Sequence, residues 1–261
     1  MRARSIATLN QLPDDEKLAI YSRFIPQEML ERFNLSPDFK DDQGNNLLLL
    51  KCRPGSTDSV LDLRDSVGAE DPLLYVHLTD TMNGQIHVLL YIVNDPDSPR
   101  FDVDKMPDGT HTEFGIYRRN LDAEVEALEA GLAPGQVRRG LRMLNCAVSA
   151  FEDFVDYLGH EVYFLDPLAY HNAIVFERYG FNYQQGRQKM ERIHTGFSTD
   201  GEFLLLLDGS SAFRQPEFSR SIRGRSWAVH DGILGEPYTD IIMYKTLGLD
   251  AGVSTFPDAE W

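Results

Sequence analysis

Apolar residues in the first half of the chain fall into short runs that polar turns separate. Three of these runs, Leu47–Cys52, Leu73–Thr81 and Ile86–Asn94, have the length and composition of strands. Residues 82–85, Met-Asn-Gly-Gln, separate the last two runs, and an Asn-Gly pair between strand-like runs is a strong hairpin signal. The pattern therefore predicts an antiparallel hairpin at this point of the chain.

Two short helices are predicted within residues 1–40. Pro13 and Pro26 each precede acidic residues, and acids in a first turn interact favourably with the helix dipole. Asp95–Asp108, with its prolines and aspartates, is predicted to be a loop. Thr112–Arg119 is predicted to be a further strand.

The second half of the chain has a helical period. Leu121–Ala130 predicts a short helix. Between Leu141 and Leu158 the apolar residues recur at steps of 3, 4, 3, 4 and 3, which places them on one helical face. Gly159 follows, as is typical of a C-terminal cap. These residues predict a long helix with one face packed on a core.

The remaining elements are shorter. Glu161–Leu165 is predicted to be a strand, Ala169–Tyr179 a helix that Gly180 ends, and Phe181 the start of another strand. Residues 197–236 are predicted to be irregular, and Thr239–Lys245 to be a final strand.

Composition limits the classes of partner. The formal net charge is −16, which repels phosphate backbones and anionic lipid, so we expect neither a nucleic-acid nor a membrane partner. No apolar run approaches the length of a membrane helix and no secretory signal is visible. Two separated cysteines, Cys52 and Cys146, favour reduced thiols, and the expected location is the cytoplasm.

Metal sites are not indicated. The seven histidines show no ligand spacing, and the aspartates of the 95–108 loop do not match the ligand order of an EF-hand. A solvated acidic loop is the favoured interpretation.

A phosphate site is a hypothesis for residues 133–140, Ala-Pro-Gly-Gln-Val-Arg-Arg-Gly. A glycine turn that leads into a helix presents unpaired N–H groups to an anion, and Arg138 and Arg139 would add positive charge in the first turn. The alternative is a tight turn whose arginines pair with the acids of residues 122–129.

Two segments resemble a known family. Residues 160–181, with Phe176-Glu-Arg-Tyr-Gly-Phe181 as the most specific part, resemble the strand–helix end of the GNAT acyl-CoA N-acyltransferases. Residues 234–247 resemble the last strand of that fold. The resemblance implies an α/β (α+β) fold with a mixed, mostly antiparallel central sheet, flanking helices and a splayed central strand pair.

The same resemblance implies an organisation and a cofactor. Residues 1–44 would be an N-terminal helical extension and 45–248 the GNAT-like domain, with insertions near 120–133 and 197–236, before a tail at 249–261. The donor would be acetyl-CoA or another acyl-CoA, with its pantetheine arm between the strands at 112–119 and 160–165. The implied cofactor-binding residues are Gly135, Gln136, Val137, Arg138, Arg139, Gly140, Asn172 and Phe176.

Catalysis by direct attack would need a base and an acid. The resemblance makes Glu113 the candidate base and Tyr170 the candidate acid. Many family members carry a tyrosine where this chain has Phe176, so a catalytically inactive protein that binds CoA or another ligand is an open alternative. An unrelated α/β binding protein is a third.

The acceptor would be an amine, either a small molecule or a peptide. The insertion at 197–236 carries Trp227, His230 and four arginines, and in this fold it would border the acceptor pocket. Because the arginine fork binds carboxylates and phosphates, we expect an acceptor with an anionic group. A homodimer is common among such folds.

Overall fold

The structure, a computed structural model, describes residues 4–112 and 118–261. The chain divides into two compact units, each assembled from three separate segments. Unit 1 contains the chain up to Asp97, Gly140–Asp166 and Tyr244–Leu249; unit 2 contains Ser98–Arg139, Pro167–Met243 and Asp250–Trp261.

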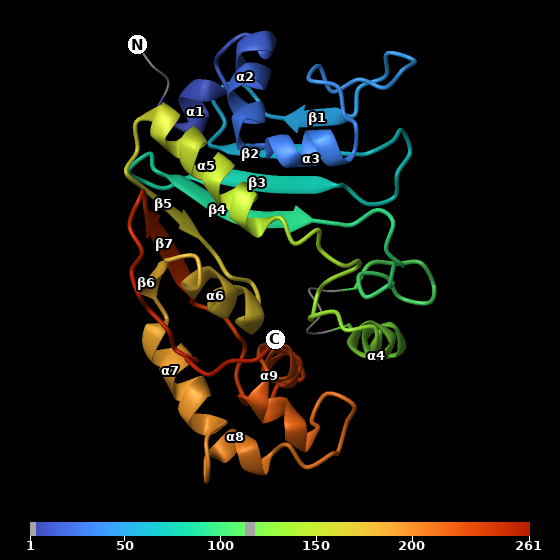
Figure 1. Cartoon of the computed structure of the whole chain (residues 1–261), viewed down its shortest axis with the longest axis vertical. Coiled ribbons are helices and arrows are strands. Elements are labelled where there is room, and N and C mark those ends of the chain that lie inside the picture. Colours follow the sequence, from blue (N-terminus) through green and yellow to red (C-terminus); the bar gives the residue numbers. More distant parts are fainter. Residues whose placement is uncertain (1–3, 113–117) are drawn as a thin grey trace. The chain divides into compact units, whose positions relative to one another are not determined.

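The described residues form a seven-stranded sheet with the strand order β1-β2-β3-β4-β5-β7-β6. The pairs β1–β2, β2–β3 and β3–β4 are antiparallel, and β4–β5 is parallel. The strands are β1 (Leu48–Lys51), β2 (Asp58–Leu63), β3 (Leu74–Asp80), β4 (Ile86–Val93), β5 (Val162–Leu165), β6 (Asn182–Gln185) and β7 (Ile242–Thr246). A mostly antiparallel open sheet with helices confirms the predicted α+β fold class (Figure 1).

The predicted hairpin is confirmed, because β3 and β4 pair on either side of the Asn-Gly turn. Gly84 has a φ of 73°, the left-handed conformation that such a turn needs. The strand β2 was missed from the sequence, since Asp58 and Asp62 interrupt its apolar pattern. The middle of the predicted strand Thr112–Arg119, residues 113–117, lies outside the described residues.

The helices of unit 1 cover its sheet. They are α1 (Ile6–Leu9), α2 (Asp14–Tyr21), the 3₁₀ turn η1 (Ser22–Phe24), α3 (Gln27–Arg32) and α5 (Leu144–Leu158). The Asp80 carboxylate at the end of β3 accepts from the N–H groups of Ile6 and Ala7 at 2.7 and 2.8 Å, which attaches α1 to the sheet. The N-terminal helices thus contribute buried residues such as Leu9, Phe24 and Met29 to the core of unit 1.

The predicted long helix is α5, and Gly159 ends it in the left-handed conformation as expected. Its aromatic residues meet those of η1, with 5.2 Å between the ring centroids of Phe24 and Phe154. Phe151 lies 5.1 Å from Tyr163 of β5. The apolar stripe read from the sequence therefore joins the N-terminal helices to the sheet.

Unit 2 contains the other helices, of which only α4 and α6 were predicted from the sequence. They are α4 (Leu121–Glu129), α6 (Tyr170–Glu177), α7 (Arg187–Gly196), α8 (Glu202–Leu205), the 3₁₀ turn η2 (Pro216–Arg220) and α9 (Ile222–His230). One apolar core joins α4 to α9, where Trp227 is fully buried beside Ala127 and Phe213. The indole N–H of Trp227 donates to the carbonyl oxygen of Leu132 at 2.9 Å.

Residues 250–261 form the last segment of unit 2. Thr255 donates from its backbone N–H and its hydroxyl to the buried Glu177 carboxylate, at 2.9 and 2.7 Å. The ring of Phe256 lies 3.5 Å from the guanidinium carbon of Arg225. The segment therefore completes the interior of unit 2.

Candidate functional site

In unit 1 the strand β4 continues to Val93 beyond the end of its parallel partner β5 at Leu165, and this stretch of β4 without a β5 pair is called the β4–β5 fork. Only His87 with Phe164 and Val88 with Leu165 are paired between the two strands. The register of β3 against β4 shifts here: His77 pairs with Leu90 and Leu78 with Val88, so Leu89 is an extra, bulged residue. A bulge bends its strand and interrupts pairing, and β4 continues to Val93 without a further β5 pair in the described chain.

The start of helix α5 contributes a second feature to this fork. A Cβ atom added to Gly140 would lie 3.5 Å from the carbonyl oxygen of Val93, so the approach to α5 passes the end of β4. The cap residue Met143 makes no side-chain hydrogen bond, and no acid lies in the first turn. The N–H groups of residues 144–146 precede the first intrahelical donor, Ala147, and therefore have no acceptor within the helix.

A histidine and an aspartate lie at the base of the fork. His87 Nε2 is 2.9 Å from Asp166 Oδ1, and the side chains are 17% and 31% exposed. If Nε2 donates to the carboxylate, Nδ1 of His87 carries the lone pair that can accept a proton. The sequence contained one signal for this pair, a histidine inside an apolar strand.

The predicted phosphate loop does not form the first turn of a helix. That part of the prediction is wrong, because α5 begins at Leu144 and Arg138 and Arg139 lie in the turns before it. The turn is closed by its own bonds: the side chain of Gln136 accepts from the N–H of Ala133 at 2.8 Å, and Arg139 donates to the carbonyl oxygen of Ala130 at 2.9 Å. The residues Gly135, Gln136, Val137, Arg138 and Arg139 lie in unit 2 and Gly140 in unit 1.

Of the strand pair expected to hold the pantetheine arm, the strand at 160–165 corresponds to β5, whose parallel neighbour in the described chain is β4. The middle of the other expected strand, residues 113–117, lies outside the described residues. Glu113, the candidate base, lies outside the described residues.

Tyr170, the candidate acid, lies in the interior of unit 2. It is 1% exposed, its hydroxyl makes no hydrogen bond in the described structure, and burial raises its pKa to about 12 although the nearby Arg225 guanidinium lowers it. Asn172 and Phe176 are half-buried on the same helix, and the Phe176 ring lies 5.1 Å from Phe181. A proton donor at Tyr170 would need the surrounding side chains to move before it contacts a substrate.

The arginines of residues 197–236 mostly bind groups within unit 2. Arg214 donates to Asp231 at 2.9 Å, Arg223 to the carbonyl oxygen of Gly131 at 2.9 Å, and Arg225 is buried. Trp227 is core rather than a pocket wall. An anionic acceptor stays a prediction, and these side chains add no support for it.

A buried ionic network lies beneath this segment. Glu124, 2% exposed, accepts from Arg119 Nε at 2.9 Å and lies 3.0 Å from His230 Nε2. Burial alone would raise the pKa of Glu124, but hydrogen bonds from His230 and Arg119 outweigh it and lower the pKa. Arg119 also donates to Asp231 at 3.1 Å. The network fixes α4 against the end of α9.

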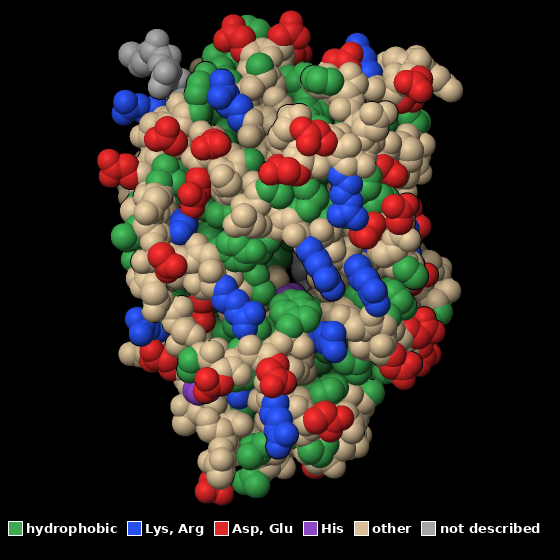
Figure 2. All heavy atoms as spheres, in the orientation of Figure 1, with side chains coloured by type: hydrophobic (Ala, Val, Ile, Leu, Met, Phe, Trp, Pro, Cys, Tyr) green, Lys and Arg blue, Asp and Glu red, His purple; other side chains and the backbone are tan. Residues whose placement is uncertain are grey.

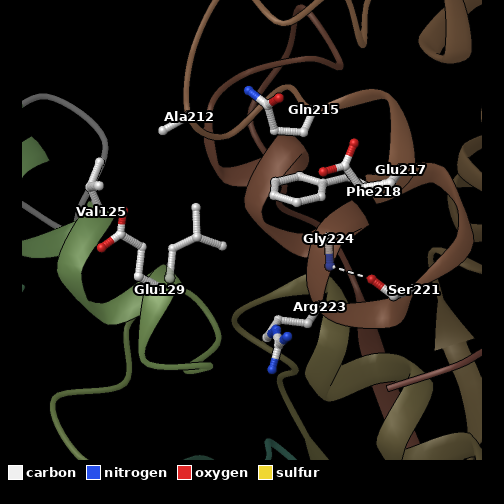
Figure 3. A pocket seen from close by; sticks show the side chains of 10 residues that line it. Val125, Glu129, Ala212, Gln215, Glu217, Phe218, Ser221, Arg223 and Gly224 are labelled. Carbon is white, nitrogen blue, oxygen red and sulfur yellow. Dashed lines mark hydrogen bonds between the residues drawn. The ribbon is translucent and has the colours of Figure 1, made fainter.

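Unit 2 also contains two cavities. One, of about 410 Å³, lies between α4 and the η2–α9 segment (Figure 3). The other, of about 580 Å³, surrounds the start of α7, where Lys189 donates to the carbonyl oxygen of Pro237 and Arg192 pairs with Glu202 and Glu236. The cations of the second cavity therefore have protein partners.

No family model, curated protein or solved structure matches the chain. In the described part of the chain, no helix combines the length and the apolar character needed to cross a membrane. Within residues 4–112 and 118–261, no three His, Cys, Asp or Glu side chains are grouped so that they could hold a metal ion. On the face drawn in Figure 2, acidic side chains are dispersed among basic and apolar ones.

Proposed function

We propose that this protein is a GNAT-like N-acyltransferase that transfers an acetyl or other acyl group from acyl-CoA to an amine. The observation that carries the proposal is the fork between β4 and β5, with its bulge at Leu89. A fork of this kind leaves strand-edge N–H and C=O groups for the amide groups of a pantetheine arm. The uncapped start of α5 beside Val93 supplies N–H groups suited to a pyrophosphate.

His87 is the base that we propose for the reaction. The imidazole takes a proton from the acceptor ammonium, and the amine nitrogen then attacks the thioester carbonyl. As the carbon–sulfur bond breaks, the attacking nitrogen gives up its second proton and the CoA thiolate takes up one proton, so that the amide and free CoA thiol are formed. Asp166 orients the ring through Nε2, so that Nδ1 accepts the proton.

The first experiment is binding. Acetyl-CoA at millimolar concentration should raise the melting temperature by mass action, and CoA should do so as well. ATP is the control for a general nucleotide effect. If neither acetyl-CoA nor CoA shifts the melting temperature, the proposal fails.

The second experiment is turnover, measured as release of free CoA with a panel of amines. His87→Gln should lower kcat by on the order of 10²-fold or more, because it removes the base. His77→Gln is a matched control, since His77 also lies near an aspartate, 3.3 Å from Asp58, but on β3. Equal losses in the two variants would exclude His87 as the base.

A non-catalytic CoA-binding protein is the second candidate. Phe176 at the usual tyrosine position and the burial of Tyr170 favour it. Acetyl-CoA binding without CoA release across the amine panel would support this candidate over the first.

A further inference from the structure

The cavity between α4 and the η2–α9 segment lies wholly within unit 2. The Arg119–Glu124–His230 network and the Trp227 core hold the two helices together beneath it. Arg223 crosses from α9 to the carbonyl oxygen of Gly131, just after α4. The volume of the cavity, about 410 Å³, lies in the range of small-molecule sites.

The opposing walls of this cavity are apolar. Val125 and Leu128 on α4 and Phe218 on η2 line the cavity, and Figure 3 shows Val125 and Phe218 on opposite sides of it. Phe218 is held close to α9 by Gly224, where an added Cβ would lie 2.7 Å from the Phe218 Cα. Only glycine at position 224 therefore permits this placement of the ring.

Several of the hydrogen-bond donors around the cavity already have protein acceptors. Arg223 donates one N–H to Gly131, the N–H of Gly224 donates to the Ser221 hydroxyl at 3.0 Å, and the side chain of Gln215 donates to the carbonyl oxygen of Ser211 at 2.7 Å. Fewer N–H groups are therefore left for a ligand that needs donors from the protein, such as a carboxylate.

Two carboxylates at the cavity, in contrast, have no ion-pair partner among the described residues. They are those of Glu129 on α4 and Glu217 on η2, which are both exposed. Together with Arg223 they give the lining one net negative charge. The cavity thus offers apolar walls and unpaired carboxylates to a ligand that supplies both an apolar body and a positively charged donor.

We infer that this cavity is a binding site for an organic ammonium ion, a primary amine that carries an aromatic or branched apolar group. The apolar group packs between Leu128 and Phe218, and the ammonium lies near Glu129 or Glu217. The site is independent of the proposed acyl transfer, and its test contains no acyl-CoA. The two proposals are therefore tested separately, and either one can fail without affecting the other.

The test is titration of the full chain with 2-phenylethylamine at pH 7, followed by protein-observed NMR or calorimetry. 2-Phenylethanol is the neutral analogue and 3-phenylpropionate the anionic one. We expect the amine to bind in the millimolar range or better and at least fivefold more tightly than either analogue. Affinity should fall as salt rises, because exposed charges are screened.

Variants locate the binding site. Glu129→Gln and Glu217→Gln should each weaken binding by roughly two- to fivefold, the range for exposed ion pairs. Glu126→Gln is the matched control: it removes the same charge from an exposed position of α4 that does not line the cavity. Phe218→Leu should weaken binding of the aromatic amine further. The melting curve of this variant shows whether the fold is retained.

Three results would overturn the inference. They are no binding of the amine at ten millimolar, equal affinity for the neutral analogue, and a loss in Glu126→Gln as large as in the two cavity variants.

Discussion

The most deeply buried polar side chains differ between the two units, although unit 1 also buries the charged residues Lys17, Asp62 and Lys245 at 6–7% exposure. In unit 1 the most deeply buried polar residues are neutral: Asn10 and Ser59 share hydrogen bonds with the Tyr21 hydroxyl at 2.7 to 3.0 Å. In unit 2 they include the charged residues Glu124 and Arg225. The contribution of a neutral hydrogen-bond network to stability does not change with pH near neutrality. A buried charge, in contrast, is tolerated only while its charged or hydrogen-bonding partner is in place. Unit 2, whose charged residues Glu124 and Arg225 are only 2% and 4% exposed, should therefore respond more strongly than unit 1 to charge removal and to acid.

The largest expected effect is from Glu124→Gln. The substitution removes the buried carboxylate that pairs with Arg119 and His230, and breaking such a network costs roughly 3 kcal/mol of unfolding free energy. Chemical denaturation at pH 7 measures the loss. Glu126→Gln, two residues further along α4 and exposed, is the control and should change stability by less than about 0.5 kcal/mol.

The same variant should alter the acid limb of the stability curve. The folded-state pKa of Glu124 is lowered from 4.5, so its contribution is complete above pH 4.5 and lost as pH falls through the folded-state pKa. If Glu124→Gln matches the wild type at pH 7, the ionic description of unit 2 is wrong.

An effect of intermediate size on the free energy of unfolding is expected from protonation of His171. Burial, with a smaller contribution from His230, lowers its pKa from 6.5 to about 3, and its Nδ1 lies 2.9 Å from the Ser226 hydroxyl. Because the unfolded chain binds the proton first, stability is lost as pH falls from 6.5 toward 3. Between pH 7.5 and pH 5 this histidine alone should cost about 2 kcal/mol.

His171→Asn isolates this term. Its stability deficit against the wild type should shrink by about 2 kcal/mol on going from pH 7.5 to pH 5. Asn10→Ala cuts the neutral network of unit 1 and should cost roughly 1–3 kcal/mol equally at both pH values. A pH-independent deficit for His171→Asn would show that the histidine is not buried in its neutral form.

The smallest effects should come from the unpaired hydroxyls, one in each unit. Tyr91 and Tyr170 have buried hydroxyls without a hydrogen-bond partner in the described structure. Tyr91→Phe and Tyr170→Phe should therefore be neutral or stabilising by up to about 1 kcal/mol. Tyr21→Phe, which loses paired bonds, should cost about 1 kcal/mol in the same urea titration. A cost above 2 kcal/mol for Tyr170→Phe would mean that its hydroxyl has a partner.

Sequence periodicity predicted those elements of unit 1 that have one clearly buried face, although it missed β2. The hairpin β3–β4 and the helix α5 follow from alternation and from the 3-4 spacing of apolar residues. In contrast, α9 was missed: it contains a glycine, two arginines and a histidine, yet most of its side chains are buried. Its burial comes from tertiary ion pairs and aromatic contacts, which no local pattern records.

The candidate site was less predictable than the fold. The partner of β5 is fixed by register across the sheet, and the bulge at Leu89 depends on how β3 and β4 align. His87 and Asp166 are 79 residues apart, and neither belongs to a recognisable motif. The cavity beside Phe218 depends on Gly224, whose role appears only once η2 lies against α9.

The interleaved course of the chain has a consequence for its synthesis. Glu177 and Arg225 leave the ribosome well before Thr255 and Phe256, which later cover them; Thr255 follows Glu177 by 78 residues. During that interval the Glu177 carboxylate on α6 and the Arg225 guanidinium on α9 remain exposed. An incompletely folded unit 2 can therefore be bound by chaperones or cleaved by proteases. No single cleavage of the chain separates the two units, because each consists of three segments. A continuous fragment that contains one complete unit therefore also contains parts of the other.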